Sequence, residues 1–154
     1  GFSKAYAMTG WRLGYTAAPK EIADAIDVLQ SHTTSNVTTF AQYGAIAALQ
    51  GDQQIVADMR DEFDVRRQYM HSRLSSIRNV GVIEPLGAFY FLVDIEKMGI
   101  KSVNFCEQLL SKQKVAAVPG QAFGADFTIR FRYDTGLDVI NEGMDRFEEF
   151  CAQH

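Results

Sequence analysis

The sequence contains few residues of the types that mark disulfide-rich, collagen-like or membrane-spanning proteins. Its 154 residues include two cysteines, three prolines and one tryptophan. Cys106 and Cys151 lie far apart and lack the spacing of a metal or redox motif, so we expect two reduced thiols and no metal site. No apolar run approaches the roughly 20 residues that cross a bilayer, and no signal peptide is present, which predicts a cytoplasmic protein without a membrane partner.

An excess of positive charge is also missing. Acidic residues outnumber lysine and arginine by 19 to 15, which gives a formal net charge of -4. Proteins that bind nucleic acid or anionic membranes electrostatically carry the opposite balance. We therefore expect no nucleic-acid partner. With 47% hydrophobic residues, 22% charged residues and no low-complexity tract, the composition is that of a globular protein.

The first half of the chain has mostly helical periodicity. Residues 11–18 predict a strand, and Pro19 is suited to begin a helix whose apolar residues follow at three- to four-residue steps. A polar loop at 31–36 precedes a second helix at about 38–50. From Gln53 one helix of roughly 25 residues is predicted. That length suits a helix that crosses between two lobes or, equally, an amphipathic helix that braces one domain.

The second half alternates between the two kinds of periodicity. Strands are predicted at 80–83, 88–94, 115–118 and 127–133, and helices at 103–111 and 138–152. In the first of these helices, Phe105, Leu109 and Leu110 form the expected apolar side. The pattern predicts an α/β or α+β sandwich in which helices pack on a small mixed sheet.

The segment Gly1–Tyr15 combines groups that suit one kind of chemistry. Lys4 offers an amine, and an amine that attacks an aldehyde must first lose its proton, which burial or a nearby cation favours. Arg12 offers a planar fork of donors that matches phosphate oxygens. Gly10 and Gly14 would let the backbone pass close to a ligand. Pyridoxal phosphate requires this combination, whereas taken singly both cations would be ordinary surface residues.

The same segment closely resembles the signature Ser-x-Ser-Lys-(x)-Gly-x-Arg-x-Gly of the class I/II aminotransferases, which are fold-type I enzymes. The resemblance implies that Lys4 is the catalytic residue, which binds the cofactor pyridoxal 5'-phosphate and then moves a proton. It also implies that Arg12 binds the cofactor phosphate. One departure is Gly1, which stands where the family usually has a serine or threonine whose hydroxyl binds that phosphate.

A third candidate residue, Arg130, lies near the end of the chain. Residues 127–133 alternate, so Arg130 and Arg132 share one face of a strand at a separation of about 7 Å. Alone, this pattern is typical of a half-buried strand with a wet basic face. The segment also resembles the family's hydrophobic-Arg-hydrophobic-Ser-Tyr-Ala pattern, which implies that Arg130 binds the α-carboxylate of the substrate. Arg132 replaces the usual serine, and either redirects specificity or faces solvent.

The resemblance covers the chain in the family's order, but it places the lysine motif at the extreme N-terminus. We therefore expect the C-terminal part of a longer enzyme that transfers an amino group between an amino acid and a 2-oxo acid. Residues 1–52 would be a remnant of the large cofactor-binding domain, and residues 53–154 the small domain, led by a long inter-domain helix. The resemblance further implies a homodimer, and we expect the fragment alone to be inactive.

Three other functions remain open at this point. Other fold-type I enzymes, such as β-lyases, decarboxylases and cyclopropane-forming synthases, share these residues. A transcription regulator can fuse such a domain to a helix-turn-helix segment, although no basic surface in this chain supports that. An interaction domain could retain the fold without the chemistry, but the presence of both Lys4 and Arg130 argues against it.

Overall fold

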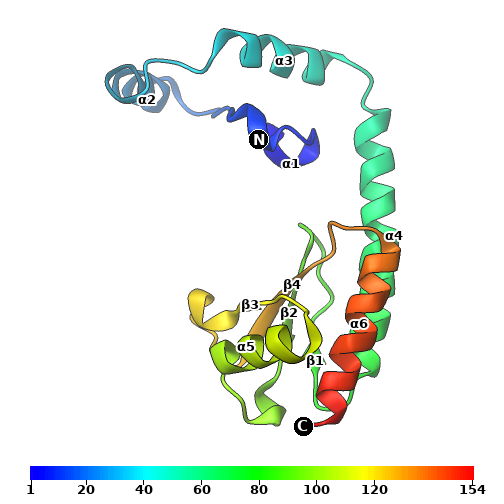
Figure 1. The fold of residues 1–154 in the computed structure, drawn as a ribbon. Coiled ribbons are helices and arrows are strands. Elements are labelled where there is room, and N and C mark those ends of the chain that lie inside the picture. Colours follow the sequence, from blue (N-terminus) through cyan, green and yellow to red (C-terminus); the bar gives the residue numbers. More distant parts are fainter. The chain divides into compact units, whose positions relative to one another are not determined.

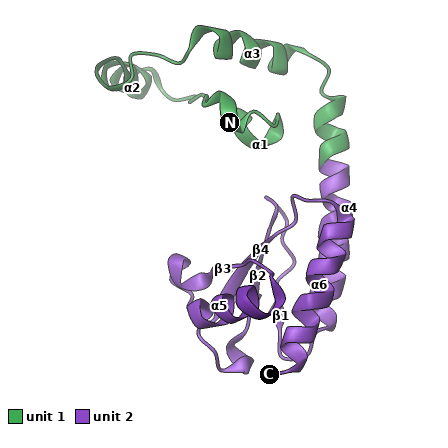
Figure 2. Ribbon diagram, viewed as in Figure 1, with its two compact units in different colours: residues 1–59 green, residues 60–154 purple.

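In a computed structural model that describes residues 1–154, the chain forms two compact units. Unit 1 comprises residues 1–59 and unit 2 residues 60–154 (Figure 2). The helix α4, Gln54–Ser76, begins in the first unit and continues in the second (Figure 1). It has 23 residues, close to the predicted length. Each unit has its own cluster of buried apolar side chains.

Unit 1 is helical. Before α4 it contains α1 (Phe2–Ala5), the 3-10 helix η1 (Thr9–Trp11), α2 (Lys20–Thr33) and α3 (Thr39–Gln50). The strand predicted at 11–18 is wrong, because residues 12–19 have no regular structure. A strand is stabilised by hydrogen bonds to a neighbouring strand, and unit 1 contains none. The predicted loop at 31–36 begins only at Thr34, since α2 continues to Thr33.

The buried cluster of unit 1 is small. It consists of Phe2, Met8 and Ala45, so the N-terminal segment packs against α3. The Trp11 ring also lies on α3, because a Cβ atom at Gly44 would come within 2.6 Å of that ring. None of the residues of α2 is buried. Large apolar side chains of α2 and α3 are exposed instead: Ile22, Ile26, Val28, Leu29, Phe40, Tyr43, Ile46 and Leu49.

Unit 2 contains one sheet of four strands in the order β1-β2-β4-β3. Its elements are β1 (Gly81–Val82), β2 (Tyr90–Asp94), the 3-10 helix η2 (Glu96–Met98), α5 (Ser102–Gln113), β3 (Val118–Pro119), the 3-10 helix η3 (Gly120–Phe123), β4 (Thr128–Arg132) and α6 (Leu137–Ala152). The predicted fold class, helices packed on a small sheet, is confirmed. All three pairings are antiparallel, however, so the sheet is not mixed. Neighbouring β3 and β4 are joined by a short connection, which permits antiparallel pairing only.

The sheet has one buried face and one open face. Ile129 and Phe131 of β4 are buried with Phe91 and Val93 of β2, beneath side chains from the three long helices. Those helical side chains are Met70, Leu74, Phe105, Leu109, Ile140, Met144, Phe147 and Phe150. The opposite face carries Arg130, Arg132 and Leu92, the last of which is 47% exposed. Antiparallel sheets commonly leave one face open in this way.

The apolar side predicted for helix 103–111 needs one correction. In α5, Phe105 and Leu109 are fully buried, but Leu110 is 52% exposed. Adjacent helical positions are turned by about 100° from one another, so Leu109 and Leu110 cannot both face the sheet. The pair therefore offers a matched comparison within one helix. None of the helices combines the length and the apolar character needed to cross a membrane.

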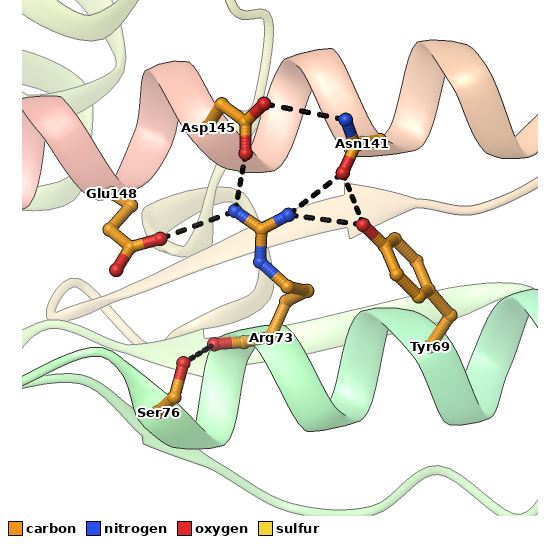
Figure 3. A network of polar contacts seen from close by, with 6 residues as sticks. All are labelled: Tyr69, Arg73, Ser76, Asn141, Asp145 and Glu148. Carbon is orange, nitrogen blue, oxygen red and sulfur yellow. Dashed lines mark hydrogen bonds and ion pairs between the residues drawn. The ribbon is translucent and has the colours of Figure 1, made fainter.

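A polar network joins α4 to α6 along their length (Figure 3). The Arg73 guanidinium donates to Asp145 at 2.6 Å and to Glu148 at 3.2 Å through Nη2. Through Nη1 it donates to the Tyr69 hydroxyl and to the Asn141 side chain, both at 3.0 Å. The Arg73 side chain is only 22% exposed, and its carboxylate partners raise its pKa. Charge-assisted bonds from a guanidinium fork are among the stronger polar contacts.

We expect Leu109→Ala to lower the free energy of unfolding of unit 2 by about 2–5 kcal/mol, because a fully buried side chain leaves a cavity. Leu110→Ala, the matched control, should change it by less than about 1 kcal/mol. Urea unfolding followed by far-ultraviolet circular dichroism measures both, since the one tryptophan lies in unit 1. Equal effects of the two substitutions would contradict the burial described for α5.

We expect Arg73→Ala to destabilise unit 2 by about 1–3 kcal/mol, because a largely buried donor with charge-assisted bonds to four acceptors is lost. Arg60→Ala on the same helix is the control. Its ion pair with Asp61 is exposed, and pairs of that kind contribute little. The same urea titration compares the two variants, and an Arg60→Ala effect as large as that of Arg73→Ala would refute the role of the network.

Candidate functional site

Lys4 lies in the short helix α1 with its side chain exposed. The turn that follows contains Ala7, whose backbone N–H donates to the Lys4 carbonyl at 3.2 Å. Ala7 has a φ of 53°, and Arg12, later in the same segment, also has a φ of 53°. Left-handed backbone costs a residue with a Cβ atom about 1–2 kcal/mol. Strained positions of this kind gather at functional sites, so they mark this segment as a candidate.

Thr9 connects the two predicted cofactor-binding residues of unit 1. Its hydroxyl donates to the Ser3 carbonyl at 2.7 Å, next to Lys4, and its own carbonyl accepts from Arg12 Nη1 at 2.9 Å. Lys4 and Arg12 are thereby brought into one hydrogen-bonded segment. The sequence analysis missed Thr9, although a threonine in a turn commonly bonds to nearby backbone.

The two glycines of the motif, Gly10 and Gly14, border open space in the structure. A Cβ atom added at Gly10 or Gly14 would meet no atom within 4 Å. Neither has a positive φ. The space that a Cβ atom would occupy is therefore open at both glycines, and the predicted approach of a ligand there stays a prediction.

Arg130 lies in unit 2, on the open face of the sheet. Its guanidinium carbon is 4.4 Å from the ring centroid of Tyr90 in β2 and 4.6 Å from that of Phe123 in η3. The Nε atom is buried and has no hydrogen-bond partner. No carboxylate of the chain forms an ion pair with this residue. Arg130 is thus a positively charged group without a counter-ion.

Arg132, two residues further on the same face, has a partner. Its Nε donates to Asp134 at 2.8 Å, and a second, shorter bond joins Nη2 to the other carboxylate oxygen. This guanidinium holds the pKa of Asp134 below its ordinary value. The Arg132 side chain is 61% exposed, so the departure from the family's serine is a solvent-facing ion pair. The two arginines of β4 therefore differ in their readiness to bind an anion.

Two cavities have mainly apolar walls. One in unit 1, of about 320 Å³, lies beside Met8, Ala48 and Ile55, and Lys4 does not line it. The other, in unit 2, has a volume of about 350 Å³ and lies between residues 115–118, β4 and α6. The chain contains no group of three or more histidine, cysteine or acidic side chains arranged to hold a metal ion.

The two cysteines are free and buried. Burial raises the pKa of Cys106 to about 11 and that of Cys151 to about 12, the latter with a contribution from Glu148. A thiol is nucleophilic as its thiolate, which such burial disfavours. Neither cysteine is therefore a candidate nucleophile.

Comparison with known proteins relates the chain to one family. The family described as "Aminotransferase class I and II" matches residues 1–147. The chain is 44% identical to an aspartate aminotransferase of Bacillus sp. (strain YM-2) over 97% of its residues, and 40% identical to an aspartate aminotransferase of Bacillus subtilis over all of them. It spans 40% of the length of each of those relatives.

Solved structures give a similar result. The aspartate aminotransferase of Thermotoga maritima superposes with a TM-score of 0.92 at 39% identity, and an aromatic aminotransferase of Pyrococcus horikoshii with a TM-score of 0.95 at 38% identity. Both comparisons cover 99% of this chain, and 39% and 42% of those chains respectively. The chain thus corresponds to about two-fifths of the proteins that it resembles.

We expect neither cysteine to react with a thiol-specific disulfide reagent at about pH 8 in the folded chain, and both to react in urea. Burial raises the pKa of these thiols from the ordinary 9.0 to about 11 for Cys106 and about 12 for Cys151. The unfolded state therefore loses protons first, so stability should fall as the pH rises from 9.0 toward 11. Rapid reaction of either thiol in the folded chain would show that it is accessible.

Proposed function

Because the chain belongs to the aminotransferase class I and II family, we propose that the whole protein is a pyridoxal-phosphate-dependent aminotransferase. It would transfer an amino group between an amino acid and a 2-oxo acid. The observation that carries this proposal is the family match over residues 1–147. That range includes Lys4, Arg12 and Arg130, to which the motif resemblance assigns the cofactor and the substrate. Each relative named above is described as an aminotransferase, which favours transamination over elimination or decarboxylation.

The residues of unit 1 fit the proposed cofactor. Pyridoxal 5'-phosphate, when bound, supplies an aldehyde and an electron-withdrawing ring. Lys4 presents its amine on the exposed side of α1, where the Nζ atom would bind the aldehyde and later carry a proton. Arg12 uses Nη1 for the Thr9 carbonyl and has further donors for phosphate oxygens.

Arg130 fits the role of substrate anchor. Amino acids and 2-oxo acids both carry a carboxylate beside the reacting carbon, so one cationic group serves both partners of the reaction. A guanidinium without an internal counter-ion binds an anion more favourably than one already in an ion pair. This distinguishes Arg130 from Arg132, which Asp134 already neutralises. The relatives' names make aspartate the first amino acid to test.

We assign residues 1–52 to a larger cofactor-binding domain and residues 53–154 to the small domain that α4 leads. The exposed apolar side chains of α2 and α3 support the first assignment, because large apolar patches are rarely left in water. The closed core of unit 2 supports the second. By analogy with the family we also propose a cytoplasmic homodimer, and negligible turnover by the 154-residue chain alone.

The proposal is tested on the intact protein that contains this chain, loaded with pyridoxal 5'-phosphate. Borohydride reduction followed by peptide mapping should place the label on Lys4. Lys4→Ala should abolish labelling and reduce transamination at least about 10²-fold, because both the amine and the proton carrier are lost. Lys20→Ala, at an exposed lysine paired with Asp24, is the control and should leave both unchanged.

A label on any other lysine would overturn the assignment of Lys4. A panel of amino acids assayed with the same preparation distinguishes amino transfer from β-elimination and decarboxylation by the product formed. An upstream helix-turn-helix segment in the intact protein, with no product from any amino acid, would support a regulator instead.

A further inference from the structure

We propose that Tyr90 and Phe123 are positioning residues that fix the plane of the Arg130 guanidinium, so that its two terminal nitrogens face the substrate carboxylate. This inference rests on the proposed role of Arg130 as substrate anchor. It concerns two aromatic side chains for which neither the sequence motifs nor the family match gives a role. Its basis is the geometry around the guanidinium within unit 2.

The guanidinium is flanked by two rings that come from different elements. Tyr90 belongs to β2 and Phe123 to the end of η3, yet both ring centroids lie within 4.6 Å of the Arg130 guanidinium carbon. Cations at such distances are attracted to the ring face, and a flat guanidinium can stack on it. A side chain with four rotatable bonds is thereby restricted to few orientations. The order is established before any ligand arrives, which lowers the entropic cost of binding.

The buried Nε atom indicates which edge of the guanidinium remains available. Among all buried side-chain nitrogens and oxygens of the chain, this is the one without a hydrogen-bond partner. A buried unpaired donor is unfavourable, so the surrounding contacts must hold it there. With Nε enclosed, Nη1 and Nη2 are the donors that a ligand can reach. A carboxylate would then bind end-on, with one oxygen at each terminal nitrogen.

Phe123 is held in place by its own backbone. In η3 the Gly120 carbonyl accepts from Ala125 N at 3.0 Å, and Gln121 N donates to the hydroxyl of the fully buried Ser102 at 3.2 Å. A Cβ atom at Gly120 would lie 2.3 Å from the Ala125 carbonyl oxygen, so the turn packs as closely as glycine permits. The ring therefore projects from a fixed turn, although it is itself 50% exposed.

The neighbouring ion pair leaves the Tyr90 ring available to Arg130. Tyr90 pairs across the sheet with Arg132, which places a second guanidinium close by. Asp134 binds that guanidinium, whose carbon also lies 6.0 Å from the ring centroid of Phe89. One cation is thus stacked while the other is paired. This division prevents the two like charges from competing for the same ring and the same carboxylate.

The first test uses the intact enzyme and steady-state kinetics. Tyr90→Leu and Phe123→Leu should each raise the KM for the amino acid by roughly 5- to 30-fold, the range expected for loss of a cation–π contact. kcat should change by less than about 3-fold, because the contact is made equally in the ground and transition states. Tyr90→Phe restores the ring without the hydroxyl and should keep the KM within about 2-fold.

The control variant is Phe127→Leu. Phe127 is 37% exposed, immediately precedes β4, and has no contact with the guanidinium. It should leave both kinetic constants unchanged. A rise in KM for Phe127→Leu equal to that for Phe123→Leu would mean that loss of any nearby ring disturbs the sheet, and would overturn the proposal. The same holds if Tyr90→Phe behaves like Tyr90→Leu.

The second test needs no catalysis and uses the 154-residue chain. In a 15N-labelled sample, the Arg130 Nε–H should exchange with water at least about 10-fold more slowly than that of Arg78, which is exposed and unpaired. Tyr90→Leu or Phe123→Leu should remove most of that difference, while Phe127→Leu should preserve it. Exchange of Arg130 as fast as Arg78 in the unmodified chain would refute the enclosed geometry.

The two tests fail for different reasons. If borohydride labels a lysine other than Lys4 while Arg130 Nε–H is protected, the function proposed above is wrong and the aromatic enclosure stands. If Lys4 is labelled but neither leucine variant changes the KM, the enclosure has no role in substrate binding and this inference is wrong.

Discussion

The direction in which Arg130 points is set by its two neighbours along β4. Ile129 and Phe131 are buried beneath the helices, and side chains of a strand alternate between faces, so Arg130 must project from the opposite side. A slip of one residue in the pairing of β2 with β4 would bury the arginine and expose two apolar side chains. The hydrophobic core of unit 2 therefore determines where its uncompensated positive charge lies.

The two units differ in how completely they bury their apolar residues. Unit 2 closes a core of seventeen buried side chains, reinforced by the network around Arg73. Unit 1 has a cluster of three, and α2 buries none of its residues. Helices are stabilised mainly by the packing of an apolar face, so the helices of unit 1 depend on surfaces that this chain alone does not supply. A chain that spans two-fifths of its relatives is consistent with that imbalance.

The elements that the sequence predicts well are those with a long apolar period. The helices α3, α4 and α6 lie within two residues of their predicted limits, and the alternation in β4 is as expected for Arg130. The strand predicted at 11–18 fails because β structure requires a pairing partner that residue preferences do not reveal. The prediction that Leu110 lies on the apolar side of its helix is wrong, because spacing alone does not define the edge of an apolar stripe.

The candidate residues themselves could be found from motifs, since Lys4, Arg12 and Arg130 carry distinctive chemistry. Their surroundings could not. Thr9 acts through bonds of its hydroxyl and its carbonyl to nearby residues, and Tyr90 and Phe123 contact Arg130 only after three separate elements have assembled. In the sequence, nothing distinguishes these two aromatic residues from those that pack in a hydrophobic core. Tyr90 lies forty positions from Arg130, and a contact across that separation depends on the tertiary fold, which local pattern does not encode.

The absence of an internal counter-ion at Arg130 has a consequence for the protein in its natural medium. Cells contain abundant small anions, and a guanidinium that the fold leaves uncompensated attracts them in proportion to their concentration. Under the substrate-anchoring role proposed for Arg130, substrate binding is then an exchange, in which a weakly held ion returns to solution as the organic acid binds. The entropy gained when that ion is released contributes to the free energy of binding. Selectivity at this position therefore depends on the ionic surroundings as well as on the shape of the ligand.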